Sequence, residues 1–247
     1  MTLLFDAPEP QVFALWADVD GTLFAGTSPN GRIYRIAAGA GEVYFEPKET
    51  YVWALARGAD GALWAATGTE GRLYRIAAKG EGEVAFDSEE THLRSLLPLA
   101  GGDLLVGSAS SGLVLRWRAR DRTVRTVYDS ALGEVVALAA APGGVTYAAV
   151  LASEASFLDL APAAKPAADT AAAVAAAAGD DPKPVVTVET ETESDAAIGS
   201  RAAGARGPRS EVVRILASGA VEPLWQSQDE TVFALSLIHI SEPTRPY

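Results

Sequence analysis

The chain alternates short apolar runs with polar turns over most of its length. Between residues 11 and 50, four such runs lie at 12–16, 22–25, 32–36 and 42–45, and β-branched and aromatic residues are frequent in them. Asp20-Gly21 separates the first two runs, and Gly31 precedes the third. Glycine lacks a Cβ and so adopts the positive φ angles that tight hairpins need. The pattern predicts four short strands joined by hairpins.

This unit of four runs is repeated in tandem. Residues 51–91 restate residues 11–50, and looser copies begin at His92 and Glu134. The frame is fixed by leucines at 15, 55, 96 and 138, spaced 40, 41 and 42 residues apart, and it returns at Leu235. Four strands per unit of about 40–45 residues are typical of the blades of a β-propeller, which are stable only when stacked on one another. Helical repeats are excluded, because a 3.6-residue periodicity is absent.

The repeats divide the chain into parts. The predicted fold is all-β, an incomplete β-propeller of four-stranded antiparallel blades, with about four blades plus flanking strands. Residues 1–159 hold the blade units, and residues 160–209 form an insertion rich in Ala, Pro and acids that has too little apolar area to fold and is predicted to be disordered. Residues 210–235 complete the fourth blade and add the first strand of the next. The blade units are placed at about 11–50, 51–91, 92–133 and 134–157.

The two ends of the chain differ from the repeat units, and a separate prediction is made for each. Residues 3–9 match the fourth strand of a unit, so they either complete the last blade of a ring or follow a clipped N-terminus. Residues 235–245, LSLIHISEPTR, resemble one reading frame of a transposon-based sequencing adapter. We therefore expect residues 236–247 to be an artefactual tail and give His239 no functional weight.

The repeat also carries a resemblance. Units such as VWALARGADGALWAATGTEGRLYRI resemble the Gly-Thr-containing propeller repeats of bacterial sensor and binding proteins, among them the periplasmic propellers of two-component regulators. The likeness covers about residues 3–157 and 210–235, whereas the Trp-Asp and Gly-His dipeptides of WD-repeats are missing. The resemblance implies a propeller fold and a periplasmic or extracellular location. It does not fix a function, because propellers host many activities.

The composition limits the classes of molecule that this protein is expected to bind. Acidic residues outnumber basic ones by 32 to 20, and the net charge of −12 argues against nucleic acid, since phosphate binding needs clustered Lys or Arg. No apolar run is long enough to cross a bilayer, so no membrane insertion is expected. There are no cysteines, which excludes disulfides and thiolate chemistry. We expect no cofactor, and the sequence leaves a protein, a small molecule or a glycan as the ligand.

Carboxylates gather in the predicted loops between blades. They predict an acidic rim that would take a cationic partner or a metal ion, although loops that keep strand ends soluble are the favoured interpretation. The residues of this acidic rim are Glu46, Glu49, Asp87, Glu89, Glu90, Asp129, Asp229 and Glu230. The stretch from Asp18 to Gly21 resembles the start of a calcium loop, but Pro29 stands where the last ligand should be, so a hairpin turn is predicted instead.

Other residues recur at fixed frame positions and are predicted to be structural. Arginines at 35, 75, 116 and 214 should pack along the strands with their heads near carboxylates. Trp53 repeats Phe13 and Phe233, and core packing is expected there, whereas Trp16 and Trp117 fall at less regular positions and are expected to be partly exposed.

Two classes of function follow. The first is a non-catalytic binding or scaffold module, such as the sensory part of a bacterial envelope protein. The second is a propeller enzyme, a lyase or a glycan hydrolase, for which His92 is the only histidine available outside the tail. The two differ in which residues converge at the mouth of the central channel. No catalytic, cofactor-binding or metal-binding residue is assigned, and the balance leans away from an enzyme.

Overall fold

The computed structural model describes residues 3–153 and 207–236. These residues belong to one compact unit, made of Met1–Asp159 and Gly207–Tyr247, whereas a second unit, Leu160–Arg206, lies outside the described residues. The predicted disordered insertion falls outside the described residues for all but its last three positions, and so does the predicted artefactual tail beyond Ser236.

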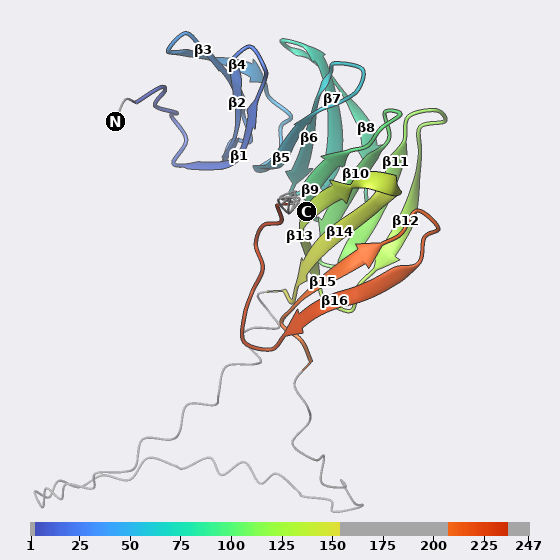
Figure 1. Cartoon of the computed structure of the whole chain (residues 1–247). Coiled ribbons are helices and arrows are strands. Elements are labelled where there is room, and N and C mark those ends of the chain that lie inside the picture. The colour runs from blue at the N-terminus through green and yellow to red at the C-terminus, as the bar shows by residue number, and fades with distance from the viewer. Residues whose placement is uncertain (1–2, 154–206, 237–247) are drawn as a thin grey trace, which may run out of the picture. The chain divides into compact units, whose positions relative to one another are not determined.

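The described chain is an all-β structure of four antiparallel blades (Figure 1). Blade 1 comprises β1 (Gln11–Ala17), β2 (Leu23–Ser28), β3 (Ile33–Ala37) and β4 (Ala40–Phe45). Blade 2 comprises β5 (Tyr51–Arg57), β6 (Leu63–Gly68), β7 (Arg72–Ala78) and β8 (Glu81–Asp87). Blade 3 comprises β9 (His92–Pro98), β10 (Leu104–Ala109), β11 (Leu113–Arg118) and β12 (Thr123–Asp129). Blade 4 comprises β13 (Glu134–Ala141), β14 (Val145–Leu151), β15 (Ser210–Ile215) and β16 (Val221–Ser227).

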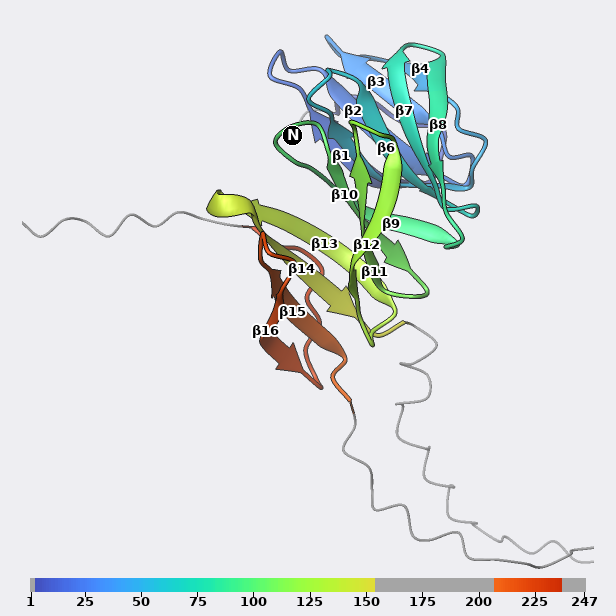
Figure 2. The ribbon, with the colours of Figure 1, turned by 90° about the vertical axis from the view of Figure 1, so that its right-hand side faces the viewer.

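Within each blade, consecutive strands pair in sequence order, and the predicted frame positions pair alike. Phe24 lies opposite Arg35, Trp64 opposite Arg75, and Leu105 opposite Arg116. In blade 4, the second strand β14 pairs with the third strand β15 although more than fifty residues separate them in the sequence. Figure 2 shows the blades from the side. The four blades and the order of their strands confirm an incomplete β-propeller.

Two glycines show how one blade is seated on the next. Gly31 and Gly71 have φ angles of 57° and 60°, in the left-handed region that favours glycine. A Cβ on Gly31 would come 2.0 Å from the backbone oxygen of Glu49, and one on Gly71 would come 1.9 Å from that of Glu90. The turn before each third strand therefore lies directly against the backbone that enters the following blade.

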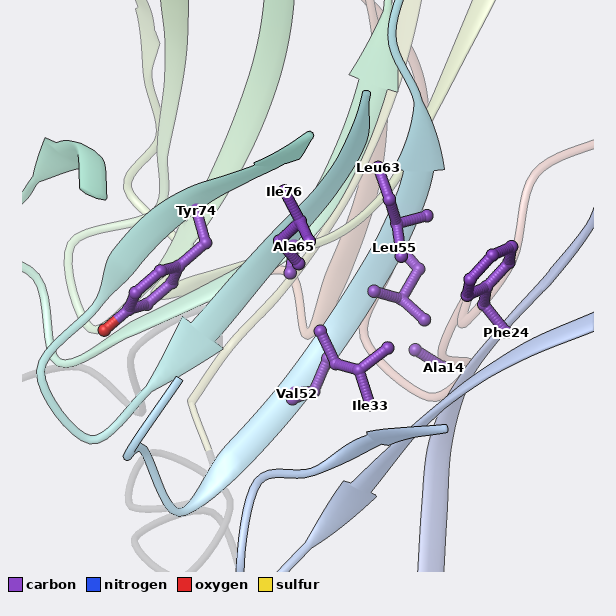
Figure 3. Packing of buried hydrophobic residues seen from close by; sticks show 9 residues of the cluster. All are labelled: Ala14, Phe24, Ile33, Val52, Leu55, Leu63, Ala65, Tyr74 and Ile76. Carbon is purple, nitrogen blue, oxygen red and sulfur yellow. The ribbon is translucent and has the colours of Figure 1, made fainter. Parts of the chain in front are cut away.

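Three apolar cores lie between successive blades. The core of blades 1 and 2 is drawn in Figure 3, where Phe24 and Ile33 of blade 1 face Val52, Leu63 and Ile76 of blade 2. A second core joins blades 2 and 3 through Trp64 and Trp117, and a third joins blades 3 and 4. Each core takes side chains from both of its blades, so a single blade cannot bury its own apolar face.

The first blade shows what happens without a neighbour. Val12 and Val52 occupy the same frame position, but Val12 is 48% exposed whereas Val52 is completely buried. Leu15 is 69% exposed and its counterpart Leu55 only 7%. The residues are alike, so the difference comes from packing: no described blade precedes blade 1.

Two flanking segments differ from the expectation that they are strands. Residues 3–9 and 231–236 form no ladder, because the described chain offers neither of them a partner strand. Phe5 nevertheless packs on Tyr34, with ring centroids 5.2 Å apart, and so covers the outer side of blade 1. In the described residues the only helical segment is a single 3₁₀ turn, Pro142–Gly144, and a membrane-crossing helix is not found there.

Candidate functional site

The first strand of each blade carries a β-bulge at one frame position. The ladders skip Phe13 in β1, Trp53 in β5, Arg94 in β9 and Val136 in β13. A bulged residue lies outside the hydrogen-bond ladder, and its side chain is re-aimed relative to its neighbours. All four side chains border one cavity of about 530 Å³, together with Gln11, Tyr51 and Phe233. We call this cavity the channel-end cavity.

An aromatic surface forms one wall of the channel-end cavity. Tyr51 stacks on Trp53 with ring centroids 4.6 Å apart and an interplanar angle of 12°. Phe13, from the neighbouring blade, contacts Trp53 at 4.7 Å. Tyr51 and Trp53 are half-buried, and Phe13 is 42% exposed. Large aromatic side chains on neighbouring first strands therefore remain within reach of solvent.

A charged pair lies beside this surface. The guanidinium carbon of Arg94 lies 4.1 Å from the centroid of the Trp53 ring, close enough for a cation–π interaction. The other side of Arg94 approaches Glu134 of blade 4, with 3.8 Å between a guanidinium nitrogen and a carboxylate oxygen. The cavity thus combines an aromatic wall with the cation of Arg94, whose anionic partner is Glu134.

His92 contacts the aromatic wall through Trp53. The indole Nε1 of Trp53 donates a hydrogen bond to Nδ1 of His92 at 3.2 Å, and the two rings meet edge to face. Burial, with the positive charge of Arg94, lowers the pKa of His92 below 6.5, so the ring is neutral near pH 7. Because Nδ1 accepts, the neutral ring carries its proton on Nε2.

Gly68 makes the contact between Trp53 and His92 feasible. A Cβ at Gly68 would come 2.0 Å from Nδ1 of His92 and 2.9 Å from Nε1 of Trp53. The corresponding second-strand positions in the other blades are Ser28, Ala109 and Leu151, as their pairing with the first strands shows. Only blade 2 therefore has space at this point for an indole and an imidazole.

The same strands also border a smaller cavity of about 330 Å³, which shares Phe13, Trp53 and Arg94 with the first. Its walls come from matching residues of the four first strands and from the segment after blade 4, including Leu15, Leu55, Leu96, Leu138 and Leu235. The leucines that fix the repeat in the sequence thus border a channel between the first strands.

These findings correct two expectations. Phe13, Trp53 and Phe233 were predicted to pack in a core, but they border the channel-end cavity, and Phe233 is 70% exposed. Trp117 was expected to be partly exposed, but it is buried against Trp64, with ring centroids 4.7 Å apart. A bulge shifts the side chains out of simple alternation, so the pattern of apolar residues does not reveal which side they face.

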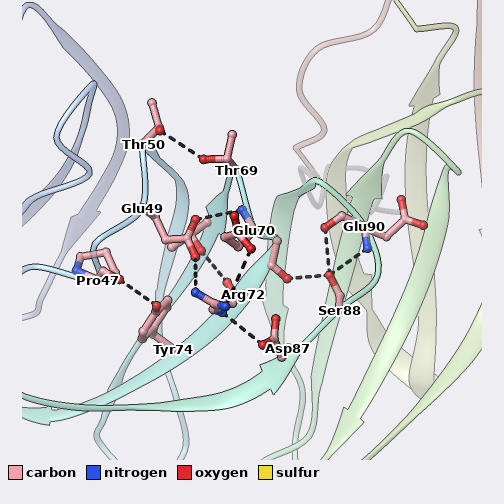
Figure 4. A network of polar contacts seen from close by, with 12 residues as sticks. Pro47, Glu49, Thr50, Thr69, Glu70, Arg72, Tyr74, Asp87, Ser88 and Glu90 are labelled. Atoms are coloured by element: carbon pink, nitrogen blue, oxygen red, sulfur yellow. Dashed lines mark hydrogen bonds and ion pairs between the residues drawn. The ribbon is translucent and has the colours of Figure 1, made fainter.

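Much of the predicted acidic rim binds the chain's own donors. Glu49 is buried, and its Oε2 accepts the backbone N–H of Glu70 at 3.0 Å, while Arg72 lies 3.6 Å from its Oε1 (Figure 4). Asp87 binds the same Arg72 at 3.2 Å. These contacts tie the segment entering blade 2 to the turn before its third strand.

A carboxylate that enters a blade and contacts the turn before its third strand, which we call the carboxylate clamp, recurs in other blades. Glu9 approaches Arg32 at 3.2 Å, Glu46 binds Arg32 at 2.7 Å, and Glu90 accepts the backbone N–H of Ser111 at 3.1 Å. The remaining rim residues, Glu89, Asp129, Asp229 and Glu230, are exposed. No contact between their carboxylates occurs in the described chain, and no three His, Cys, Asp or Glu side chains there gather as metal ligands would.

The other predicted sites are structural. The recurrent arginines reach carboxylates as expected: Arg75 binds Asp60, with 2.6 Å between nitrogen and oxygen, and Arg116 binds Asp103 at 2.7 Å. The stretch that resembled a calcium loop is a turn, in which the backbone N–H of Gly21 donates to the carbonyl of Asp18 at 3.0 Å. The pKa of the Asp18 carboxyl is lowered by its hydrogen bond from Arg57.

Comparison with known proteins supports the fold and leaves the function open. No family model matches the chain, and no curated protein matches its sequence. A streptogramin B lyase is similar in structure, with a TM-score of 0.58, 14% identity, and coverage of 93% of this chain and 59% of that one. A catalytically inactive virginiamycin B lyase from Staphylococcus aureus, solved with quinupristin, is similar with a TM-score of 0.57, 13% identity and coverage of 91% and 59%.

A third similar structure is a protein of unknown function from Bacteroides caccae, with a TM-score of 0.56, 14% identity, and coverage of 93% of this chain and 73% of that one. The chain spans about three fifths of the length of the two lyases. At this level of identity the likeness concerns the propeller fold alone.

Proposed function

We propose that this chain is a non-catalytic binding module, and that its ligand occupies the channel-end cavity. One observation carries the proposal: the bulged first strands of neighbouring blades present an accessible aromatic wall of Tyr51, Trp53 and Phe13. Aromatic residues that pack only for stability are normally covered, whereas accessible aromatic surfaces mark ligand and partner sites. The resemblance of the repeats supports a place for this module in the sensory or interaction part of a bacterial envelope protein.

The chemistry of the wall favours a ligand with a flat ring. Tyr51, Trp53 and Phe13 form an apolar surface that a sugar ring or an aromatic ring would contact, and the guanidinium of Arg94, which lies over Trp53, would bind polar substituents of such a ring. Gln11 adds an amide at the same cavity. A cavity of about 530 Å³ falls within the usual range of small-molecule sites. We therefore propose a glycan or another small ring compound as the ligand.

Saturation-transfer NMR on the full chain tests this proposal. The probes are methyl β-glucoside, methyl β-N-acetylglucosaminide and N-acetyltyrosinamide. We expect transfer to ring protons of at least one probe, and its loss in Trp53→Ala. The matched control is Trp225→Ala, which removes a half-buried tryptophan on β16, away from the cavity. Equal transfer in the wild type and in Trp53→Ala would contradict the site.

The alternative is a propeller lyase or glycan hydrolase, and His92 is the observation that favours it. The imidazole is neutral near pH 7, the state in which histidine acts as a general base. Its Nδ1 accepts a hydrogen bond from Trp53 and its Nε2 carries the proton, so His92 would act as a base through Nδ1 only after the Trp53 hydrogen bond opens. Mass spectrometry of the same probes after incubation with the full chain distinguishes the classes. Turnover that His92→Gln abolishes would establish the enzyme, and unchanged probes that still bind would support the module.

A further inference from the structure

A second cavity lies between blades 3 and 4, near the turns that join first to second and third to fourth strands. It measures about 1010 Å³ and is bordered by the turn between the first two strands of both blades and by the turn between the last two strands of blade 4, including residues 98–100, 140–145 and 215–219. The channel-end cavity is formed by other residues, from the beginning of the first strands. We call the second cavity the cleft of blades 3 and 4.

The cleft exists because the repeat departs from its own pattern there. At the frame position that faces the next blade, blade 1 has Phe24, blade 2 has Trp64 and blade 3 has Leu105. Across the interface, Trp117 of blade 3 meets Trp64, whereas Ile215 of blade 4 lies in one apolar cluster with Leu105. Smaller side chains at matching positions leave space that two indoles fill in the preceding interface.

A third substitution enlarges the cleft. Arg57 of blade 2 covers the ring of Phe24, with 5.0 Å between the guanidinium carbon and the ring centroid. The matching residue of blade 4, by register with the second strand, is Ala140, which borders the cleft. The side chain that covers the interface of blades 1 and 2 is therefore reduced to a methyl group at the interface of blades 3 and 4.

The cleft is positive although the protein is acidic. Three arginines, Arg116, Arg118 and Arg125, border it, and Asp103 is the only acid there. Asp103 is occupied by its bonds to Arg116 and to the backbone N–H of Ala119, and Arg118 pairs with Asp121 at 3.3 Å. Within the described chain, Arg125 is exposed and has no ion-pair partner.

The equivalent cavity between blades 2 and 3 provides a comparison inside the same molecule. It measures about 420 Å³, and its charged residues are two acids, Asp60 and Glu83, and two arginines, Arg75 and Arg122. It is therefore smaller and electrically balanced. Extra volume and excess positive charge occur together in the cleft of blades 3 and 4.

We propose that the cleft of blades 3 and 4 binds a small amphipathic carboxylate. Leu105, Val127 and Ile215 provide an apolar surface for an aliphatic chain. Arg125 supplies a guanidinium that can form paired hydrogen bonds with a carboxylate. A volume of about 1010 Å³ is sufficient for a ligand of this class. The inference does not depend on the proposed function of the channel-end cavity.

Titration calorimetry of the full chain with two probes tests it. Sodium octanoate carries the carboxylate, and octan-1-ol has the same chain without the charge. We expect octanoate to bind about tenfold more tightly, the factor that a charged hydrogen-bonded pair typically gives. Arg125→Gln should remove this preference and leave octanol binding unchanged. Arg120→Gln, which removes an exposed arginine outside the cleft, is the matched control.

A second variant tests the place of binding. Leu105→Trp gives blade 3 the residue that blade 2 has at this position and should fill the cleft, so octanoate binding should be lost while the circular dichroism spectrum stays that of the wild type. If this variant does not fold, the Arg125 comparison decides alone. Equal affinity for octanoate and octanol, no binding of either, or tight octanoate binding in Arg125→Gln would each overturn the proposal.

Discussion

The interface of blades 2 and 3 and that of blades 3 and 4 solve the same packing problem differently. The first holds the Trp64–Trp117 pair and keeps only the smaller cavity of about 420 Å³. The second has Leu105 and Ile215 at the matching positions and retains a large cleft. Both join blades with the same strand order, so the difference lies in side chains and not in the backbone. Propeller interfaces therefore tolerate an unfilled region when other contacts hold the blades together.

Hydrogen bonds to a buried carboxylate also hold blades 3 and 4 together. Glu211 of β15 accepts hydrogen bonds from Tyr128 at 2.7 Å, from Ser130 at 2.9 Å and from Gln226 at 3.1 Å. The matching position of blade 2 is Arg72, which binds Glu49 of the preceding segment. This position therefore carries a negative charge in blade 4 and a positive charge in blade 2. Its partners in the preceding segment are hydroxyl groups in blade 4 and a carboxylate in blade 2. The clamp is preserved as an arrangement although its residues are not.

The largest effect is expected at the tryptophan pair. Trp64→Ala should lower the free energy of unfolding by about 3–5 kcal/mol, because it removes a buried indole and its contacts with Trp117. Leu105→Ala should cost about 2 kcal/mol, since its surroundings already open into the cleft. Urea denaturation of the full chain followed by fluorescence measures both. Equal losses would remove the energetic distinction between the two interfaces.

Loss of the carboxylate clamp ranks next. Glu211→Ala should lower the free energy of unfolding by about 2–3 kcal/mol, because three donors lose a buried charged acceptor. Glu230→Ala, at an exposed position, should change it by less than about 0.5 kcal/mol. Thermal denaturation compares the two. If Glu211→Ala melts like the wild type, polar contacts do not hold this interface.

The phenol in the same clamp predicts a dependence on alkaline pH. Burial and the hydrogen bond to Glu211 raise the pKa of Tyr128 from 10.0 to about 12. A raised pKa means that its contribution to stability is complete below pH 10 and is lost as the pH rises through about 12. Tyr128→Phe should cost about 1 kcal/mol near neutral pH and should reduce the loss of stability between pH 10 and 12. Unfolding curves across this range that are parallel for variant and wild type would contradict the assignment.

The smallest expected effect is a gain. Thr146 stands where blades 1 to 3 have leucine, as its pairing with Ile215 shows. Thr146→Leu should raise the free energy of unfolding by about 0.5–1 kcal/mol by extending the apolar contact at the edge of the cleft. A loss of stability of similar size would show that the threonine hydroxyl is needed there and that the cleft is not simply underpacked.

The repeat made most of the fold predictable. The leucine frame and the Asp-Gly turns place strands in all four blades, because period-two patterning and turn chemistry act locally. The strand status of residues 3–9 and 231–236 was not predictable in this way, since a strand also needs a neighbour with which to pair. The exposure of Val12 against the burial of Val52 has the same cause.

The sites were less accessible from the sequence. The channel-end cavity depends on bulges at Phe13 and Trp53, which no residue type announces. A usable signal was the variation at this frame position, where Arg94 replaces an aromatic residue while the preceding position stays apolar in all four blades. The sequence shows the carboxylates of the acidic rim. It does not show that Glu49 is buried against Arg72, because this contact joins segments from different turns.

At each bulge, a position that holds the fold stands next to a position that differs between the blades. The residue before the bulge is completely buried in blades 2, 3 and 4, where it is Val52, Leu93 or Val135, so most changes there would destabilise the fold. The bulged residue lies outside the ladder and is at least partly exposed, and it differs between the blades, as Phe, Trp, Arg and Val. Duplication of one unit adds one further variable residue to the channel and leaves the others as they were. Specificity in such a chain can therefore diverge unit by unit, and libraries randomised at 13, 53, 94 and 136 alone would sample it at little cost in folding.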